Sequence, residues 1–345
     1  MPGTDFSIHY PLDAVPEPGG YLEIRPGIFW LRIPLPGRLD HINLWLLDAG
    51  DSWTLVDTGL DWEEARQAWD KIAAELVQDR PVGRIIVTHY HPDHVGLAGY
   101  LGKKFKTNLA MTRVTAERTR FLLNCRADDW KKNVQSFCRL HGIAAEDQYL
   151  SFITGQRYRN VVSKLPETIA FLDHEQPIPI GAYEWQPLVV CGHAEDHLSL
   201  FCPALQLLIS GDQVLPTITS NVGLHVNNGD EDALDEYLAS MTRFSNLPEE
   251  TLVLPSHGQV FTGLYKRIAA INHNHARQLQ KVHALCATPA SAWEVSPKLF
   301  SRPLDDFNRI LAFGETLAHL EYLHNRGELT KQFHNGTCYY AQAGN

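Results

Sequence analysis

The sequence has few cysteines, no long apolar run and no excess of basic residues. Its six cysteines are scattered through 345 residues without a Cys-x-x-Cys pair, which argues against a disulfide-stapled scaffold and favours reduced thiols in a cytoplasmic protein. No apolar stretch approaches the ~20 residues that span a bilayer. The first residues lack a basic segment followed by an apolar one, so we expect neither a secretory signal nor a membrane span.

Acidic side chains outnumber basic ones, with 40 Asp and Glu against 30 Lys and Arg and a formal net charge of −10. A long nucleic-acid footprint needs the opposite balance, because the phosphates must be neutralised by cations. The charge does not exclude a local basic groove. We therefore expect a small-molecule substrate rather than a nucleic-acid partner.

Histidine and aspartate are instead concentrated in one segment, Thr88-His-Tyr-His-Pro-Asp-His94. An apolar, β-branched run at 84–88 precedes it and predicts a buried strand, and the run at 95–101 has helical character. The segment therefore lies on a strand-to-helix connection, where a rigid scaffold presents a loop to solvent. Imidazole and carboxylate groups at this density favour a borderline divalent cation such as zinc.

Three later apolar runs also end in a residue type that binds metals. Residues 188–193 end in Gly-His193, residues 207–212 in Ser-Gly-Asp212, and residues 251–257 in Ser-His257, which Gly258 follows. In each case a neighbouring glycine lets the backbone approach closely. Four strand ends with the same pattern predict that their polar side chains meet at one site.

With these motifs, the chain resembles the metallo-β-lactamase superfamily over about Gly27 to Gly258. Leu55-Val-Asp57-Thr-Gly59 is similar to the family's early Asp-Thr-Gly turn. The resemblance implies an α/β fold, an αββα sandwich, and two metal ions. The implied ligands are His89, His91 and His193 for one metal and Asp93, His94 and His257 for the second, with Asp212 bridging the two.

Aspartate at the bridging position resembles the hydroxyacylglutathione-hydrolase-like branch of the family. Lactamases of one branch have a cysteine at this position, which argues against antibiotic hydrolysis as the main activity. The preference for an acyl thioester substrate rests on this resemblance and not on a residue that would bind the thiol carrier.

This ligand set predicts a catalytic centre, because closed structural zinc sites are usually Cys-rich and four-coordinate. Two zinc ions about 3.5–4 Å apart can share a hydroxide, since a bound cation lowers the pKa of water toward about 7. That hydroxide would attack an electrophilic carbonyl or phosphorus. The same ligands accept iron or manganese, depending on availability. The residues to which we assign catalytic roles are Asp93, Asp212 and His225.

Other residues near the predicted centre have more open roles. Asp57 is expected to orient the metal loop as a hydrogen-bond acceptor, and His197 to stand beside the ligands without binding metal. Asn221 and His225 lie in the loop after the bridging aspartate. Three interpretations stay open for them: contact with the substrate, donation of a proton to a leaving group, or a plain surface loop. Cys191 is not needed as a ligand because the set is already complete.

The chain divides into an extended, proline-rich arm (1–26), a catalytic domain (27–263) and a C-terminal domain (264–345). Within the catalytic domain, residues 112–174 form a predicted helical insertion, which covers the site as a lid or substrate wall, packs on the outer surface, or forms a homodimer contact. The expected strands are 28–33, 42–47, 53–56 and 107–111, and the expected helices are 62–77, 118–123, 130–140 and 149–165.

The C-terminal domain is predicted to contain helices over 264–286 and 305–325, followed by a hairpin with an Asn335-Gly336 turn. This order resembles the winged-helix-like tail of a superfamily subgroup that includes a lactamase-like endoribonuclease. Residues 300–345 contain four Lys and Arg against five Asp and Glu, a net of −1, which is the wrong balance for a polyanion. We therefore expect this tail to be a packing or dimerisation element.

The sequence thus predicts a dinuclear zinc hydrolase that uses a metal-bound hydroxide on a small ester-like substrate, with an acyl thioester preferred. Two alternatives stay open. One is a metal-dependent endoribonuclease, which the tail suggests and the charge opposes. The other is a hydrolytic dehalogenase of an aromatic substrate, an activity found among metallo-β-lactamase-like proteins. A non-catalytic binding protein is disfavoured because no ligand position is missing.

Overall fold

The strands of this protein form two large sheets and a C-terminal hairpin. The computed structural model describes residues 6–144, 155–226, 232–300 and 303–344. The strands are β1 (Gly20–Arg25), β2 (Ile28–Pro34), β3 (His41–Asp48), β4 (Trp53–Val56), β5 (Val82–Ile86), β6 (Asn108–Met111), β7 (Ala170–Phe171), β8 (Ile178–Ile180), β9 (Tyr183–Val190), β10 (His197–Cys202), β11 (Leu207–Gly211), β12 (Leu252–Pro255), β13 (Leu329–His334) and β14 (Thr337–Gln342).

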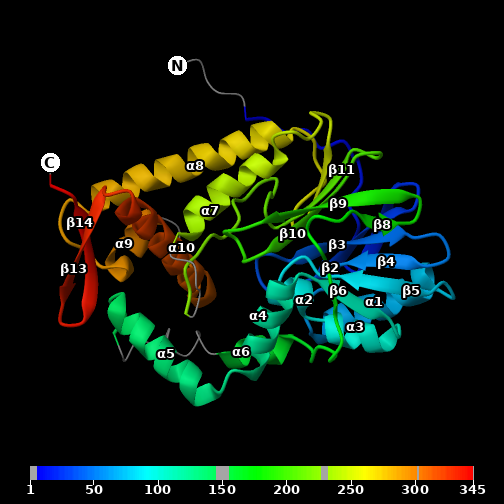
Figure 1. Cartoon of the computed structure of the whole chain (residues 1–345), viewed down its shortest axis with the longest axis horizontal. Coiled ribbons are helices and arrows are strands. Elements are labelled where there is room, and N and C mark those ends of the chain that lie inside the picture. The colour runs from blue at the N-terminus through cyan, green and yellow to red at the C-terminus, as the bar shows by residue number, and fades with distance from the viewer. Residues whose placement is uncertain (1–5, 145–154, 227–231, 301–302, 345) are drawn as a thin grey trace.

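The first sheet has seven strands in sequence order, β1 to β7, and the second has the order β12-β11-β10-β9-β8. Neighbours from β1 to β4 are antiparallel, whereas β4 to β7 pair in parallel. In the second sheet β11 and β12 are parallel and the other pairs are antiparallel. Figure 1 shows the two sheets stacked at one end of the molecule and the hairpin β13–β14 at the other.

The two sheets pack face to face because their strands are apolar on both faces. Trp30 and Trp45 point into a core shared with Leu200 and Ile209 of the second sheet. The next side chain along β2, Leu31, belongs to a different core on the outer face, as the alternation of side chains along a strand requires. Buried strands with helices outside both sheets give the αββα layers that we expected.

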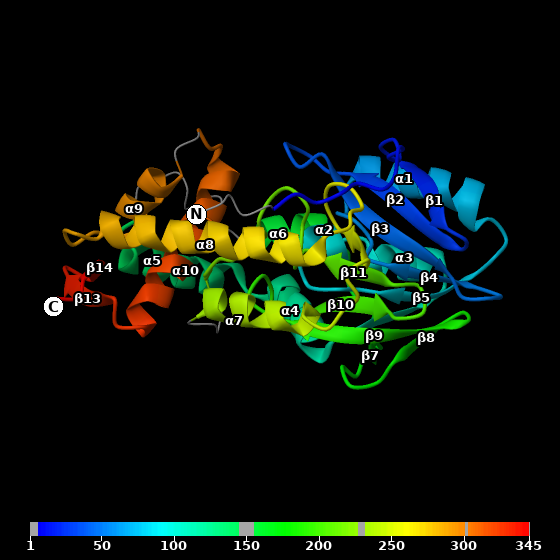
Figure 2. The same ribbon diagram turned by 90° about the horizontal axis from the view of Figure 1, so that it is seen from above.

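The helices cover the outer faces and build the C-terminal end, and Figure 2 shows α8 running from the sheets to that end. They are α1 (Glu63–Ile72), which continues into a π-helical turn (Ala73–Val77), α2 (Pro92–Val95), α3 (Ala98–Lys104), α4 (Arg113–Asn124), α5 (Ala127–Leu140), α6 (Gly155–Val161), α7 (Ala233–Ser240) with the 3₁₀ turn Met241–Phe244, α8 (Leu264–Leu285), α9 (Ala292–Leu299) and α10 (Asp306–Asn325). Within the described ranges, no helix is both long and apolar enough to cross a membrane.

The predicted insertion contains α4, α5 and α6. Its last helix ends at Val161 rather than at residue 165, and the expected helical residues 149–154 lie outside the described ranges. α5 packs on C-terminal elements: the Thr337 hydroxyl donates to the Arg139 carbonyl at 3.0 Å, and the Phe137 and Phe313 ring centroids are 6.0 Å apart. The insertion therefore joins the C-terminal end to the sandwich, and its roles as lid or dimer contact stay predictions.

β1, β7, β8, α7 and α9 were not predicted from the sequence. Gly20–Arg25, which we placed in an extended arm, forms β1 and pairs with β2. α9 was not among the expected helices. It contains Pro297, and it begins at a capping box in which Ser291 and Glu294 satisfy each other's backbone N–H groups.

The C-terminal hairpin is present where the sequence predicts it. Its turn residues, Asn335 and Gly336, have φ of 51° and 82°, as a two-residue hairpin turn requires. The winged-helix assignment of the tail stays a prediction.

Candidate metal centre

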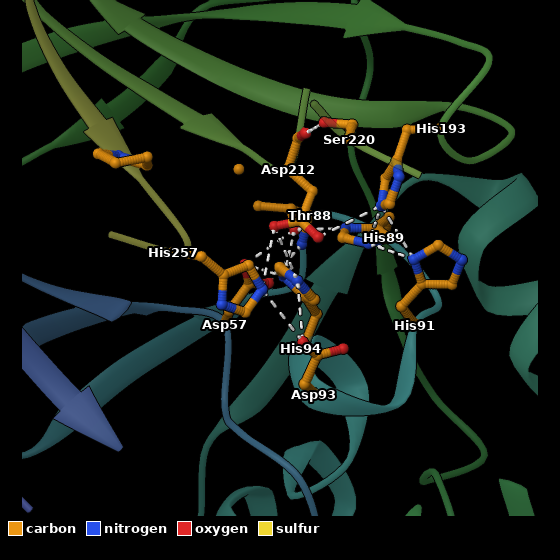
Figure 3. Close-up of polar contacts among 12 residues, drawn as sticks. Asp57, Thr88, His89, His91, Asp93, His94, His193, Asp212, Ser220 and His257 are labelled. Carbon is orange, nitrogen blue, oxygen red and sulfur yellow. Dashed lines mark hydrogen bonds and ion pairs between the residues drawn. The ribbon is translucent and has the colours of Figure 1, made fainter. Parts of the chain in front are cut away.

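The predicted metal ligands converge from both sheets. His193 follows β9, Asp212 follows β11 and His257 follows β12, and each lies just past the carboxyl end of its strand. The remaining candidates come from the loop after β5 and from the short helix α2 that follows it. Figure 3 shows the labelled side chains from these segments gathered in one cluster, with Asp212 between the His193 and His257 sides.

One half of the cluster consists of three imidazoles whose nitrogens face each other. His89 Nε2 lies 2.9 Å from His91 Nδ1, which lies 3.0 Å from His193 Nε2, and the two Nε2 atoms of His89 and His193 are 3.2 Å apart. A tetrahedral zinc ion with bonds of about 2.0–2.1 Å separates its ligand atoms by about 3.3–3.4 Å. The three nitrogens are therefore placed close to the separation that one metal ion requires.

The other half combines carboxylate oxygens with two more imidazoles. His257 Nε2 lies 3.3 Å from Asp93 Oδ2, and His94 Nε2 lies 3.8 Å from the same oxygen. Asp212 Oδ1 lies 3.4 Å from His94 Nε2 and 3.5 Å from His257 Nε2. Asp93, His94 and His257 thus form a second group able to hold a metal ion.

Asp212 reaches both halves with different oxygens. While Oδ1 faces His94 and His257, Oδ2 lies 3.4 Å from His193 Nε2. Two buried atoms at the centre, His94 Nε2 and Asp212 Oδ1, have no hydrogen-bond partner. Such atoms are costly to bury unless something binds them, so the donor set fits divalent cations.

Burial and neighbouring charges shift the pKa values of the cluster residues in different directions. Burial, reinforced by neighbouring imidazoles, holds the pKa of His89 and of His91 well below the usual value. Burial acts in the same direction on the other two rings, but nearby aspartates outweigh it and raise the pKa of His94 well above its usual value and that of His257 to about 10. Burial also opposes ionisation of Asp212, yet these imidazoles hold its pKa well below the usual range. At neutral pH and without metal, Asp212 is therefore ionised beside protonated His94 and His257, and a cation that binds these rings has to displace their protons.

Asp57 fixes the loop that carries the histidines. Its Oδ1 accepts from the Thr88 backbone N–H, and its Oδ2 accepts from the Thr88 hydroxyl and from His94 Nδ1, all at 2.8 Å. The residue has a φ of 63°, a left-handed conformation that Asp and Asn adopt more readily than most residues. These bonds confirm the expected acceptor role and turn His94 Nε2 toward the other donors.

Substituting Asp57→Asn should weaken metal binding about 10- to 100-fold, the usual effect of removing a hydrogen-bond partner of a ligating histidine. Asparagine keeps the left-handed backbone but replaces one acceptor oxygen with a donor and removes the charge. The measurement is zinc affinity by competition with a chelating dye. Asp48→Asn, at the opposite end of β3 from His41, is the matched control. Equal zinc affinities of the Asp57 variant and the wild type would refute this role.

The sequence did not single out His41 and Asn43, which hold the His257 loop. The His41 carbonyl accepts from His257 Nδ1 at 2.9 Å. The His41 side chain also takes part, because its Nε2 accepts from the Gly258 N–H at 3.1 Å. Asn43 Nδ2 donates to the Pro255 and Gly258 carbonyls, both at 2.9 Å. The sequence signal that could have identified them is the presence of two polar residues at the start of β3, an otherwise apolar strand.

His197 and Cys191 lie beside the ligands. His197 Nε2 accepts from the Asp212 N–H at 3.1 Å, and its ring packs on Gly211, where a Cβ would come within 2.5 Å of it. Burial lowers its pKa to about 3, which leaves the ring neutral. Cys191 belongs to none of the metal-capable groups found among the described residues.

Asn221 and His225 lie on the loop after β11. The Asn221 carbonyl accepts from His193 Nδ1 at 2.8 Å. Burial lowers the pKa of His225 to about 4, so at neutral pH its ring is neutral and offers an N–H hydrogen bond. Its assignment as a proton donor stays a prediction.

Comparison with known proteins places these features in a family. The sequence pattern of the Metallo-beta-lactamase superfamily matches residues 37–257, and that of the Metallo-beta-lactamase-like C-terminal domain matches residues 279–343. The curated "Probable metallo-hydrolase YqjP" of Bacillus subtilis (strain 168) is 25% identical over 90% of this chain and 96% of that protein.

Two solved structures resemble the whole chain. A beta-lactamase domain protein from Burkholderia ambifaria is 36% identical, with 97% of each chain covered and a TM-score of 0.87. A metallo-beta-lactamase family protein from Thermus thermophilus is 28% identical, with 93% of this chain and all of that chain covered and a TM-score of 0.80. From the superfamily match over most of the chain and the αββα layers with their His and Asp cluster, we conclude that this protein belongs to the metallo-β-lactamase superfamily.

Proposed function

We propose that this protein is a dinuclear metal-dependent hydrolase of a small ester-like substrate, with an acyl thioester as the preferred class. The observation that carries the proposal is the position of Asp212, whose two oxygens face two separate donor groups. One carboxylate shared by two groups is the arrangement that a two-metal site needs. Imidazole-rich donors suit zinc, and iron or manganese fits the same set.

Cations bound at these positions would lower the pKa of water and polarise a substrate carbonyl. The protein's own contribution is to hold the donors in a fixed, largely buried arrangement. His89 and His94 are fully buried, and Asp212 is 7% exposed. Low exposure of the donor groups strengthens their electrostatic effect on a reacting carbonyl.

A cationic side chain is connected to the three-histidine half of the cluster through the Tyr90 ring. The Arg118 guanidinium on α4 lies 5.8 Å from the Tyr90 ring centroid and 5.5 Å from that of Phe121. The Tyr90 ring is in turn 5.0 Å from the His91 ring. Tyr158 anchors this segment by donating to the Tyr90 carbonyl at 2.6 Å. We infer that Arg118 binds an anionic group of the substrate, such as a carboxylate or phosphate on a thiol carrier.

The substrate class is tested with a panel containing an acyl-glutathione, an acyl-CoA, a lactone, a cephalosporin, a chlorinated aromatic and a single-stranded RNA. Thioester hydrolysis with the highest kcat/KM supports the proposal. Preferred cleavage of the RNA would replace it with the endoribonuclease, and release of chloride would replace it with the dehalogenase.

Arg118→Ala should raise KM for thioesters with an anionic carrier about 10- to 100-fold, because a charge-assisted hydrogen bond contributes about 1.5–3 kcal/mol. A thioester of an uncharged thiol should show no such increase. Steady-state kinetics on the two substrates measures the difference. Arg120→Ala is the matched control, because the Arg120 side chain donates to the Pro166 and Glu167 carbonyls instead. An equal loss on both thioesters would contradict the anion-binding role.

A further inference from the structure

The loop after β11 connects the metal centre to the C-terminal helices. The Asn221 carbonyl on this loop accepts from His193 Nδ1 at 2.8 Å. That hydrogen bond fixes the ring and leaves Nε2 facing the other donors. A partner of this kind determines both the tautomer and the orientation of a ligating histidine.

The Asn221 side chain is itself bound to α10. Its Nδ2 donates to the Leu311 carbonyl at 3.3 Å and to Glu315 Oε2 at 3.4 Å. Close by, the Leu224 N–H donates to the Gly314 carbonyl at 3.1 Å. The loop therefore rests on one turn of α10 through three hydrogen bonds.

Glycine at position 314 makes this close approach possible. A Cβ at Gly314 would lie 2.5 Å from the ring of His225 and 3.1 Å from the Leu224 carbonyl. Any larger residue would have to push the loop away from α10. The contact therefore depends on the helix backbone as well as on side chains.

α8 holds the first part of the same loop. Arg267 is 9% exposed, and its guanidinium donates to the Leu215 carbonyl at 2.5 Å and to the Ile218 carbonyl at 2.6 Å. The Ser220 hydroxyl donates back to the Asp212 carbonyl. Two helices beyond the catalytic sheets thus hold the loop between the bridging aspartate and Asn221.

The contacts on the other side of the cluster are different. His257 is held by the carbonyl of His41, in β3 of the first sheet, and His94 by Asp57, which directly follows β4 of the same sheet. The described contacts of Asn221 reach only His193 among the candidate ligands. The C-terminal helices therefore act on one half of the cluster.

We propose that α8 and α10 position the metal centre, with Asn221 as the positioning residue that orients His193 for the metal held with His89 and His91. The inference rests on the proposed two-metal centre and not on the identity of the substrate. It gives the C-terminal helices a role in metal binding in addition to their role in stability.

The test is a zinc titration of the full-length protein in competition with a chelating dye, with two equivalents resolved. Asn221→Ala keeps the backbone carbonyl that binds His193 but removes the side-chain bonds that hold it on α10. It should therefore weaken one equivalent by up to about 10-fold, the lower end for loss of a ligand's hydrogen-bond partner, and Glu315→Ala should weaken the same equivalent less; both should leave the other equivalent unchanged. Glu315→Gln keeps an acceptor oxygen and should restore wild-type affinity. Phe307→Ala, on the same helix with the side chain 56% exposed, is the control and should match the wild type.

Two results would overturn the inference: unchanged affinity for both equivalents in Asn221→Ala and Glu315→Ala, or equal weakening of both equivalents in these variants. Thermal unfolding of the metal-free variants separates a positioning effect from loss of folding, since positioning leaves the melting temperature close to that of the wild type. Failure of the wild type to bind two equivalents would instead refute the proposed two-metal centre, and the inference with it.

Discussion

Replacing Asp212 with alanine is expected to remove the carboxylate that would bridge the two proposed metals and to lower kcat/KM at least about a thousandfold, or about 4 kcal/mol of transition-state stabilisation. The reason is electrostatic, because this carboxylate is shared by His193 on one side and His94 and His257 on the other. Two cations held close together need an anion between them. Metal analysis of the purified variant, together with its kinetics on the best substrate, measures both effects.

Two controls separate the bridge from general damage. Asp212→Asn keeps the shape and one oxygen but loses the charge, and should retain more metal than the alanine variant. Asp70→Ala removes a carboxylate from an exposed ion pair with Lys104 and should leave activity unchanged. Two equivalents of metal and full turnover in Asp212→Ala would rule out the bridging role.

Truncation after Pro303 is expected to give insoluble or unfolded protein, because it removes much of a core that α10 and the hairpin share with the catalytic domain. Phe313, Leu317, Leu320 and Leu323 are each at most 2% exposed. At about 1.5–3 kcal/mol for each large side chain, the four together contribute about 6–12 kcal/mol, which is comparable to the about 5–15 kcal/mol by which domains are stable. Expression yield and thermal unfolding measure the effect.

Point substitutions distinguish burial from chain length. Leu320→Ala should destabilise the full-length protein by about 2–5 kcal/mol, whereas Phe307→Ala, at a site 56% exposed, should change stability by less than about 0.5 kcal/mol. A soluble truncated protein with full activity would contradict this account. Loss of a tight, strongly salt-dependent RNA affinity on truncation would favour the nuclease alternative.

The sequence predicted the site best where residue types that bind metals follow the ends of apolar strands. The four strand-end segments predicted the residues that the structure brings together, because the carboxyl ends of their strands meet at one edge of the sandwich. The two-residue turn at Asn335-Gly336 could also be predicted, because its backbone conformation depends on those two residues and not on distant contacts.

Contacts between distant segments could not be predicted in this way. Asn43 holds a loop more than two hundred residues away, and Asn221 binds α10. The residues next to each asparagine in the sequence do not indicate which distant segment it binds. α9, which begins at a capping box and contains Pro297, was not identified from the sequence. β1 was placed in a proline-rich arm, because this strand depends on pairing with β2.

The central claim is that the protein hydrolyses its substrate with two metal ions, and the most direct measurement is activity during stepwise zinc addition to chelated protein. We expect chelation to abolish hydrolysis, and activity to return with added zinc until two equivalents per chain are bound. Full activity after one equivalent, or hydrolysis that survives chelation, would contradict the two-metal account.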